Sequence, residues 1–150
     1  MRNKRKILMV CLGNICRSPL AHGIMEHMVR AEGLDWEVDS AGTGNWHVGE
    51  APDHRSIATA RKYGVDISGQ CCRQFTYDDF EVYDSIYVMD HNNYKDVLNL
   101  ARTDVDREKV KLFLGSDIVP DPYYDDGMFD AVYQMIERRC RELIRQEIAR

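Results

Sequence analysis

A cysteine followed closely by an arginine is the feature of this chain best suited to chemistry. Cys11 precedes the stretch Leu12-Gly13-Asn14-Ile15-Cys16, and Arg17-Ser18-Pro19 follows it. A loop of this kind can turn its backbone N–H groups inward to bind an anion, and a helix N-terminus adds positive potential. The guanidinium of Arg17 can bind two oxygens of a tetrahedral dianion. This setting favours the thiolate form of Cys11, so the sequence predicts a nucleophile held against a bound phosphate.

Two alternatives compete for the same loop. A Walker-type nucleotide site is disfavoured, because the glycine spacing and the Lys-[Ser/Thr] pair of that loop are missing. In the other alternative, Cys11 is an ordinary buried cysteine at a strand end and Arg17 is a surface charge. The surrounding residues favour the phosphate loop: Gly13 and Asn14 tolerate the unusual φ angles that a tight curl needs, and Pro19 is well suited to a first helical turn.

The elements that must position this loop alternate along the chain. Short apolar or alternating runs predict strands at 7–10, 36–41, 86–89 and 110–114. Helices are predicted from Pro19 to a C-cap at Gly33, at 53–64, in a short segment opened by 76–79, at 92–101 and at 128–149. The alternation predicts a three-layer, doubly wound α/β fold. Its four-stranded parallel sheet has helices on both faces and the phosphate-binding loop after the first strand.

No repeat, low-complexity tract or linker divides the chain, so residues 1–150 are expected to form a single domain. Ligands of such sheets bind beyond the carboxyl ends of the strands. Polar residues are predicted there after each strand: Cys11, Ser40 and Asp90 after the first three, and Asp121 in the loop after the fourth. We therefore expect these side chains to meet at one edge of the sheet.

Composition excludes several other classes of protein. With 20 Lys and Arg against 25 Asp and Glu, the formal net charge is −5, which argues against bulk nucleic-acid binding. No run approaches the roughly 20 apolar residues of a membrane span, and no apolar segment of a signal peptide follows the basic start at 1–6. We expect a cytoplasmic protein that contacts neither nucleic acid nor membrane.

The five cysteines are Cys11, Cys16, Cys71, Cys72 and Cys140. An odd number without a secretory signal favours free thiols in a reducing compartment. A structural zinc site would need paired Cys-x-x-Cys or Cys/His spacings, which these positions do not supply. No metal and no cofactor are therefore expected.

At this level of detail a family resemblance is apparent. Residues Cys11 to Pro19 match, residue for residue, the signature of the low-molecular-weight protein tyrosine phosphatases. The similarity continues through most of the chain, in Ser40-Ala41-Gly42-Thr43, Trp46-His47-Val48-Gly49, Ala51-Pro52-Asp53, Arg73-Gln74, Met89-Asp90 and Asp121-Pro122-Tyr123-Tyr124.

The resemblance implies an activity and a set of roles. Cys11 would attack the phosphorus of phosphotyrosine in a protein substrate, Arg17 and the loop amides would stabilise the transition state, and Asp121 would act as general acid and then base. The remaining roles follow from the same resemblance: Ser18 hydrogen-bonds the Cys11 sulfur, Asn14 and Ser40 brace the loop, Asp90 orients Arg17, Trp46 and Tyr123 wall the pocket, and Cys16 is the redox partner of Cys11. Nothing in the sequence demands more than a monomer.

One departure from the family concerns the loop's support. Gln70 stands where many members have a histidine that hydrogen-bonds the phosphate loop, although a glutamine could also donate such a bond. Cys71, Cys72 and Cys140 have no role that the sequence assigns.

Four alternatives to a tyrosine phosphatase remain. A protein-arginine phosphatase would tend to have threonine where Ile15 stands, and an apolar Ile15 suits a phenyl ring better. An arsenate reductase of the same fold relays a disulfide through two cysteines several residues apart, whereas Cys71 and Cys72 are adjacent. A non-catalytic phosphotyrosine-binding module would lack the nucleophile or the acid. A phosphocysteine carrier of sugar transport would lack Arg17.

Overall fold

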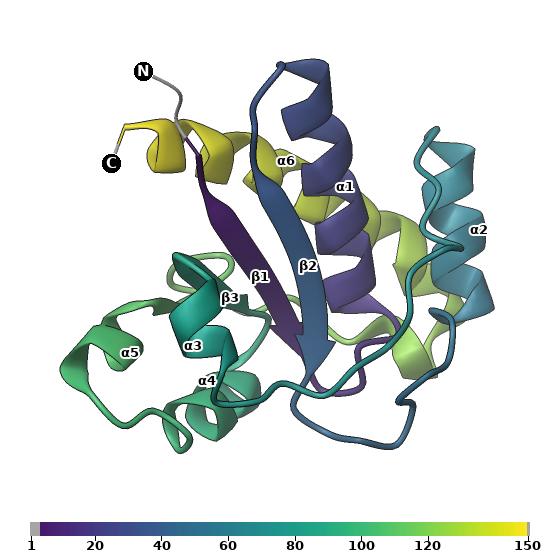
Figure 1. Ribbon diagram of the computed structural model, residues 1–150. Helices are drawn as coiled ribbons and strands as arrows, with labels where there is room; N and C mark the ends of the chain where they lie inside the picture. The colour runs from purple at the N-terminus through teal and green to yellow at the C-terminus, as the bar shows by residue number, and fades with distance from the viewer. Residues whose placement is uncertain (1–3, 150) are drawn as a thin grey trace.

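A computed structural model describes residues 4–149 and places four parallel strands in one sheet (Figure 1). The strands are β1 (Lys6–Cys11), β2 (Glu37–Gly42), β3 (Ser85–Val88) and β4 (Val110–Leu112). Their order across the sheet is β2-β1-β3-β4. The predicted four-stranded parallel sheet is confirmed, and β1, which carries the phosphate loop, is one of its two central strands.

Helices cover both faces of the sheet, as predicted. Six α-helices are present in the described residues: α1 (Arg17–Ala31), α2 (His54–Lys62), α3 (Asp79–Val82), α4 (His91–Leu98), α5 (Asp104–Glu108) and α6 (Phe129–Ile148). In Figure 1, α1, α2 and α6 lie on one side of the sheet, and α3, α4 and α5 lie on the other. Two one-turn 3₁₀ helices, η1 (Pro122–Tyr124) and η2 (Asp126–Met128), precede α6.

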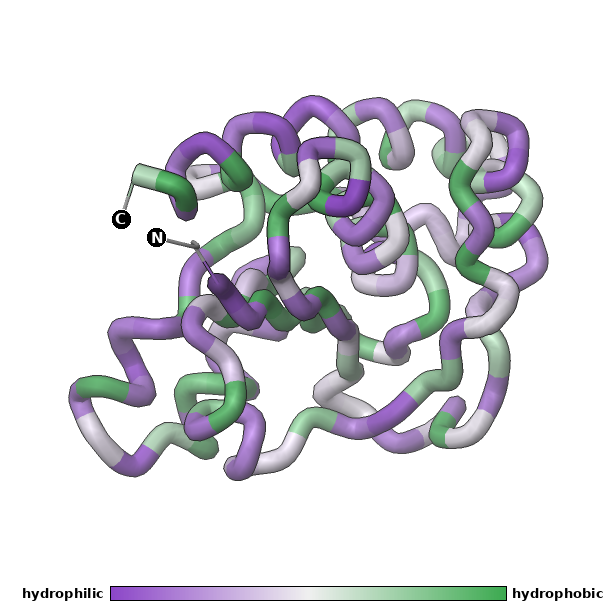
Figure 2. The backbone as a smooth tube through the Cα atoms, turned by 45° about the horizontal axis from the view of Figure 1, so that its top comes forward, coloured by the Kyte–Doolittle hydropathy of each residue, from purple (hydrophilic) through white to green (hydrophobic). Residues whose placement is uncertain are grey.

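The unbroken apolar run of β1 is explained by burial on both of its faces. Ile7 and Met9 pack in the core cluster under α1 and α6, while Leu8 and Val10 pack in the cluster on the α3 and α4 side. All four side chains are fully buried, and each such burial contributes about 2 kcal/mol. Figure 2 shows the matching pattern in the helices, along which hydrophilic and hydrophobic stretches alternate.

Helix ends follow local signals in the sequence. The Asp53 carboxylate caps α2 by accepting a hydrogen bond from the Arg55 N–H at 2.8 Å. Gly33 and Gly64 follow α1 and α2 with φ angles of 70° and 85°, a conformation that glycine adopts without strain. The predicted stripe of α6 is buried throughout, from Phe129 to Leu143.

Three local expectations were wrong. Ser40 lies within β2 and not after it, because β2 stays paired with β1 as far as Cys11 and Gly42. The short helix α3 begins at Asp79 and not at residue 76, and the Asp79 carboxylate accepts from the Thr76 N–H at 2.9 Å. The fourth strand ends at Leu112, two residues earlier than expected.

Helix α5 was not anticipated, although its signal is in the sequence. Thr103 and Asp106 form a capping box, in which each side chain accepts a hydrogen bond from the other residue's N–H. Among residues 4–149, no helix is long and apolar enough to cross a membrane. The basic start considered above lies partly outside the described residues, which begin at Lys4.

A buried carboxylate joins the C-terminal end of α6 to β3 and to Arg5, the residue before β1. Glu147 is fully buried, and it accepts a hydrogen bond from Arg5 Nε at 3.0 Å and pairs with the second terminal nitrogen of Arg5 at 2.8 Å. The Tyr87 hydroxyl donates to the same carboxylate. The cation beside Glu147 is therefore needed to compensate a charge that water does not reach.

We expect Arg5→Ala to lower the free energy of unfolding by about 3 kcal/mol, because the Glu147 carboxylate would stay buried without its cationic partner. Lys4→Ala is the matched control: it removes an exposed pair with Asp35 at 3.4 Å and should cost less than about 1 kcal/mol. Urea denaturation of both variants measures the difference. Equal losses of unfolding free energy in the two variants would show that the buried pair contributes no more to stability than the exposed pair.

Candidate active site

The predicted phosphate loop joins the last residue of β1, Cys11, to the first residue of α1, Arg17. Its carbonyls point outward, because those of residues 11, 12, 14, 15 and 16 accept hydrogen bonds from donors that lie outside the turn. The donors are the N–H groups of Thr43, Gly44, Asp53 and Leu20 and the thiol of Cys72. The N–H groups on the opposite side of these peptides therefore face the inside of the turn, where an anion can accept from them.

Asn14 makes the sharp bend of this loop. Its φ is 58°, and among residues 4–149 no other non-glycine residue has a positive φ. Asparagine tolerates this conformation better than most residues. Gly13 does not share it, so the predicted backbone reason for Gly13 is wrong. A Cβ on Gly13 would instead lie 3.3 Å from the ring of His47, a tight contact that glycine avoids.

The outer side of the loop is held by the side chains of Asn14 and Cys72 and by the backbone N–H of Arg73. Asn14 Nδ2 donates to Ser18 Oγ at 2.8 Å, and Asn14 Oδ1 accepts from the Arg73 N–H at 3.1 Å. The buried thiol of Cys72 donates to the Asn14 carbonyl at 2.7 Å. Cys72 thus has a place behind the loop that sequence reasoning missed. Its only sequence signal was its position next to Arg73, one of the residues that carry the family resemblance.

Ser40 and Gln70 lie near the loop but do not bind it directly. The Ser40 hydroxyl is 3.0 Å from His22 Nδ1, on the side of β2 that faces α1. The expected bracing of the loop by Ser40 is therefore wrong, because its strand position turns the hydroxyl toward the helix. Gln70 Nε2 donates to the Pro19 carbonyl at 3.1 Å, in the first turn of α1. Gln70 supports the helix that follows the loop instead of the loop itself.

The sulfur of Cys11 lies at the bottom of the pocket, within 3.0 Å of the Ser18 hydroxyl. That hydroxyl also accepts from Asn14, so its own proton is left for the sulfur or for the more distant Ala41 carbonyl at 3.5 Å. A hydroxyl donor and the N-terminus of α1 both stabilise negative charge on sulfur. The arrangement suits a thiolate nucleophile.

Arg17 is almost fully buried, with 3% of its surface exposed. One terminal nitrogen donates to Asp90 at 2.7 Å and to the Val119 carbonyl at 3.1 Å. Burial alone would lower the pKa of Arg17, but the charges of Cys11, Asp90 and Asp121 outweigh it and raise that pKa. The side chain is thus fixed through one nitrogen, and its second terminal nitrogen lies 3.7 Å from Asp121.

Asp121 lies in the segment between β4 and α6, at the start of η1. One carboxylate oxygen accepts from the Tyr123 N–H at 3.1 Å, and the other is the oxygen that faces Arg17. The side chain is 37% exposed, so it can exchange protons with solvent. The structure therefore brings Cys11, Arg17 and Asp121 together, as the sequence predicted for the edge of the sheet.

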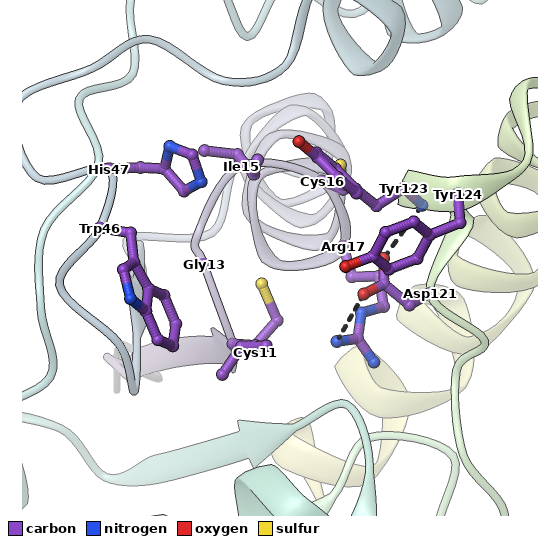
Figure 3. A pocket seen from close by; sticks show the side chains of 11 residues that line it. Cys11, Gly13, Ile15, Cys16, Arg17, Trp46, His47, Asp121, Tyr123 and Tyr124 are labelled. Carbon is purple, nitrogen blue, oxygen red and sulfur yellow. Dashed lines mark hydrogen bonds and ion pairs between the residues drawn. The ribbon is translucent and has the colours of Figure 1, made fainter.

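A cavity of about 350 Å³ opens above the sulfur. It is lined by the phosphate loop and by Trp46, His47, Asp121, Tyr123 and Tyr124. In Figure 3 the sulfur of Cys11 points into the space between Trp46 on one side and Tyr123 and Asp121 on the other. Flat side chains on opposite sides of a deep anion site can accommodate a ring that carries a phosphate.

The position of the Trp46 ring depends on Gly44. A Cβ on Gly44 would lie 2.0 Å from the indole ring, so the ring rests directly on the glycine backbone. Trp46 is otherwise 65% exposed. Gly44 is a second residue of the site that sequence reasoning missed, because a lone glycine in a loop has no pattern that identifies it.

All five cysteines are free thiols. Burial raises the pKa of Cys16 to about 12, and the charge of Asp53 acts in the same direction. At neutral pH Cys16 is therefore a protonated thiol. Among residues 4–149, no three His, Cys, Asp or Glu side chains are grouped in a way that could hold a metal ion.

Comparison with known proteins gives one consistent family. The family model described as low molecular weight phosphotyrosine protein phosphatase matches residues 6–150. The low molecular weight phosphotyrosine protein phosphatase of Sus scrofa is 37% identical over 150 residues, which cover 93% of this chain and 94% of that protein.

Solved structures agree with the sequence comparison. A protein tyrosine phosphatase from Entamoeba histolytica, with Hepes in its active site, has a TM-score of 0.87 and 32% identity, covering 93% of this chain and 94% of that one. The Drosophila arginine phosphatase has a TM-score of 0.86 and 34% identity, with 94% and 96% covered. Because two phosphatases of different named specificity are about equally similar, overall likeness does not separate their substrates.

Proposed function

The chain belongs to the low molecular weight phosphotyrosine protein phosphatase family, and we propose that it hydrolyses phosphotyrosine in protein substrates through a phosphocysteine on Cys11. One observation carries the proposal. The Cys11 sulfur, the Arg17 guanidinium and the Asp121 carboxylate line one pocket, below side chains that can hold a phenyl ring.

In the first step the thiolate of Cys11 attacks phosphorus. The S–P bond forms as the bond between phosphorus and the tyrosyl oxygen breaks, and the electron pair passes to that oxygen. The loop amides and the second terminal nitrogen of Arg17 stabilise the charge on the other phosphate oxygens. Donors of this kind, fixed before the reaction, typically contribute a factor of about 10²–10³ each. The contacts of Arg17 with Asp90 and Val119 support such a fixed position.

Asp121 handles the proton in both steps. In its acid form it protonates the leaving phenolate, which departs poorly as an anion because tyrosine has a pKa of about 10. In the second step water attacks the phosphocysteine, Asp121 accepts a proton from that water, and the S–P bond breaks with its electron pair returning to sulfur. Phosphate and the Cys11 thiolate are then regenerated. The partial exposure of Asp121 supports this exchange of protons with water.

The pocket walls support a phenyl ring as the group that enters. Trp46 and Tyr123 present flat surfaces, and Ile15 adds an apolar side chain at the phosphate loop. A protein-arginine phosphatase is the second candidate, and the likeness to the Drosophila arginine phosphatase favours keeping it. Against it, a charged guanidinium would lose hydration beside Ile15 without a counter-charge from that residue.

The remaining alternatives have less support. Cys72 is buried behind the loop while Cys71 is exposed, which does not suit a thiol relay of the arsenate reductase kind. The presence of Cys11, Arg17 and Asp121 disfavours a non-catalytic binding module.

We propose that residues 1–150 form one catalytic domain that acts as a monomer in the cytoplasm, where its free thiols would stay reduced. Sedimentation analysis at micromolar concentration tests whether the protein is a monomer in solution.

Cys11→Ser should abolish hydrolysis of aryl phosphates, measured without metal and in the presence of a chelator. Asp121→Asn should lower kcat/KM for phenyl phosphate about 100-fold or more, and much less for p-nitrophenyl phosphate, whose leaving group needs little protonation. Asp117→Asn, an exposed acid in the segment before Asp121, is the control and should leave both values unchanged. Full activity of Cys11→Ser would contradict the mechanism.

Three peptides of one sequence, carrying phosphotyrosine, phosphoserine or phosphoarginine, test the substrate class. We expect kcat/KM to be highest for phosphotyrosine, because the flat walls of the pocket can hold a ring and a seryl side chain has none. Ile15→Thr should narrow the preference for phosphotyrosine over phosphoarginine by about tenfold. Faster hydrolysis of phosphoarginine by the unaltered protein would overturn the assignment.

We also propose that Cys16 protects Cys11 from irreversible oxidation. Peroxide oxidises the Cys11 thiolate to a sulfenic acid, and the sulfur of Cys16 then displaces water from it to form a disulfide. The high pKa of Cys16 keeps it from being oxidised first. The two residues lie in one short loop and line the same pocket, which supports their pairing.

Peroxide-treated protein should therefore regain most of its activity with dithiothreitol. Cys16→Ser should regain almost none after the same treatment, because the sulfenic acid would be oxidised further. Cys140→Ser, which alters a fully buried thiol under α1, is the control and should recover like the unaltered protein. Equal recovery of the Cys16→Ser variant would refute the pairing.

A further inference from the structure

The segment that carries Asp121 is anchored before that residue at Val119, which is fully buried, donates its N–H to the Met89 carbonyl at 2.8 Å and accepts from Arg17. It runs from the end of β4 to the start of α6 and contains only the single turns η1 and η2 among its described residues. Within it, the Asp121 carboxylate accepts from the nearby Tyr123 N–H and faces Arg17 at 3.7 Å, which is longer than a hydrogen bond. The position of Asp121 over the pocket therefore depends on how the segment is attached to the rest of the fold.

Arg55, in the first turn of α2, attaches the segment on the C-terminal side of Asp121. One of its terminal nitrogens donates to the Tyr123 carbonyl at 3.0 Å and to the Asp126 carboxylate, both in the segment. Its guanidinium also lies over the rings of Tyr123 and Phe129, at 5.3 and 4.7 Å from their centroids. The Arg55 side chain thus contacts the chain before η2, at Tyr123, and after η2, at Phe129.

The other edge of the same guanidinium is fixed to Asp53. Arg55 Nε and its second terminal nitrogen donate to the two Asp53 oxygens at 3.0 and 2.8 Å. The Asp53 N–H in turn donates to the Ile15 carbonyl of the phosphate loop at 2.8 Å. A continuous set of contacts therefore runs from the phosphate loop through Asp53 and Arg55 to the turn that bears Asp121.

We propose that Arg55 is a positioning residue, which holds Asp121 at the height above Cys11 where it can protonate the leaving oxygen. The proposal rests on the general-acid role assigned to Asp121 above. It requires the planar fork of arginine, because a lysine ammonium cannot contact the Asp53 carboxylate, the Tyr123 carbonyl and Asp126 from fixed directions at once. Arg55 does not face the phosphate loop's anion site, so it acts through the acid and not on the phosphate.

Two roles for Arg55 predict different kinetics. If it only stabilises the fold, its loss lowers kcat/KM by the same factor for every aryl phosphate. If it positions the acid, the loss is large for leaving groups that need a proton and small for those that do not. The ratio kcat/KM is the suitable quantity, because it reports the steps up to formation of the phosphocysteine and excludes its later hydrolysis.

The experiment measures kcat/KM of Arg55→Ala and Arg55→Lys with a series of aryl phosphates from p-nitrophenyl to phenyl phosphate. We expect Arg55→Ala to lose about 10- to 100-fold with phenyl phosphate and less than about threefold with p-nitrophenyl phosphate. Arg55→Lys, which keeps the charge, should show an intermediate loss with the same dependence on the leaving group. Arg61→Ala, an exposed arginine on the same helix, is the matched control and should show no change.

Measuring the effect of Arg55→Ala in the Asp121→Asn variant decides between the two roles. If Arg55 acts through the acid, adding Arg55→Ala to Asp121→Asn should cause no further leaving-group-dependent loss. If Asp121→Asn depends on the leaving group but Arg55→Ala does not, the positioning role is wrong and the proposed function stands. If Asp121→Asn has no such dependence, the general-acid assignment itself fails. Should Arg55→Ala not fold, Arg55→Lys carries the same comparison.

Discussion

A backbone turn can aim its N–H groups at one anion only if the carbonyls on its outer side find donors elsewhere, and much of this fold supplies those donors. They come from the segment after β2, from the start of α2, from α1 and from Cys72. Because a buried carbonyl without a partner costs about 1–3 kcal/mol, each of these segments must dock for the turn to close. The shape of the phosphate loop thus depends on the assembled domain, even though the residues of the loop are contiguous in the sequence.

A second requirement is that a guanidinium be buried and yet partly free to bind. Asp90 meets it, because one oxygen accepts from Arg17 while the other accepts from the Asn93 N–H and caps α4. The Val119 carbonyl adds a contact from the segment after β4. The ends of β1, β3 and β4 are therefore joined through one side chain, at the edge where parallel strands place their ligands.

The sequence was sufficient for what local patterns and a contiguous motif encode. The buried run of β1, the stripe of α6 and the joint location of Cys11, Asp90 and Asp121 all followed from periodicity and strand order. What it missed depends on contacts between distant segments: Cys72 behind Asn14, and Arg55 against Tyr123. Ser40 was expected to brace the loop, but its hydroxyl pairs with His22 of α1, and a contact between β2 and α1 is not encoded in either segment alone.

The thiol that supports the loop from behind differs from an imidazole in the pH at which it changes charge. Burial, together with the nearby Cys11 charge, raises the pKa of Cys72 to about 11, and the amide of Gln70 does not titrate at all. A histidine in place of Cys72 would change charge near neutral pH, and the bend at Asn14 would then be held by a different interaction above and below that point. The Cys72 thiol instead stays protonated through the neutral range, so it keeps the same hydrogen bond to the Asn14 carbonyl on both sides of that point.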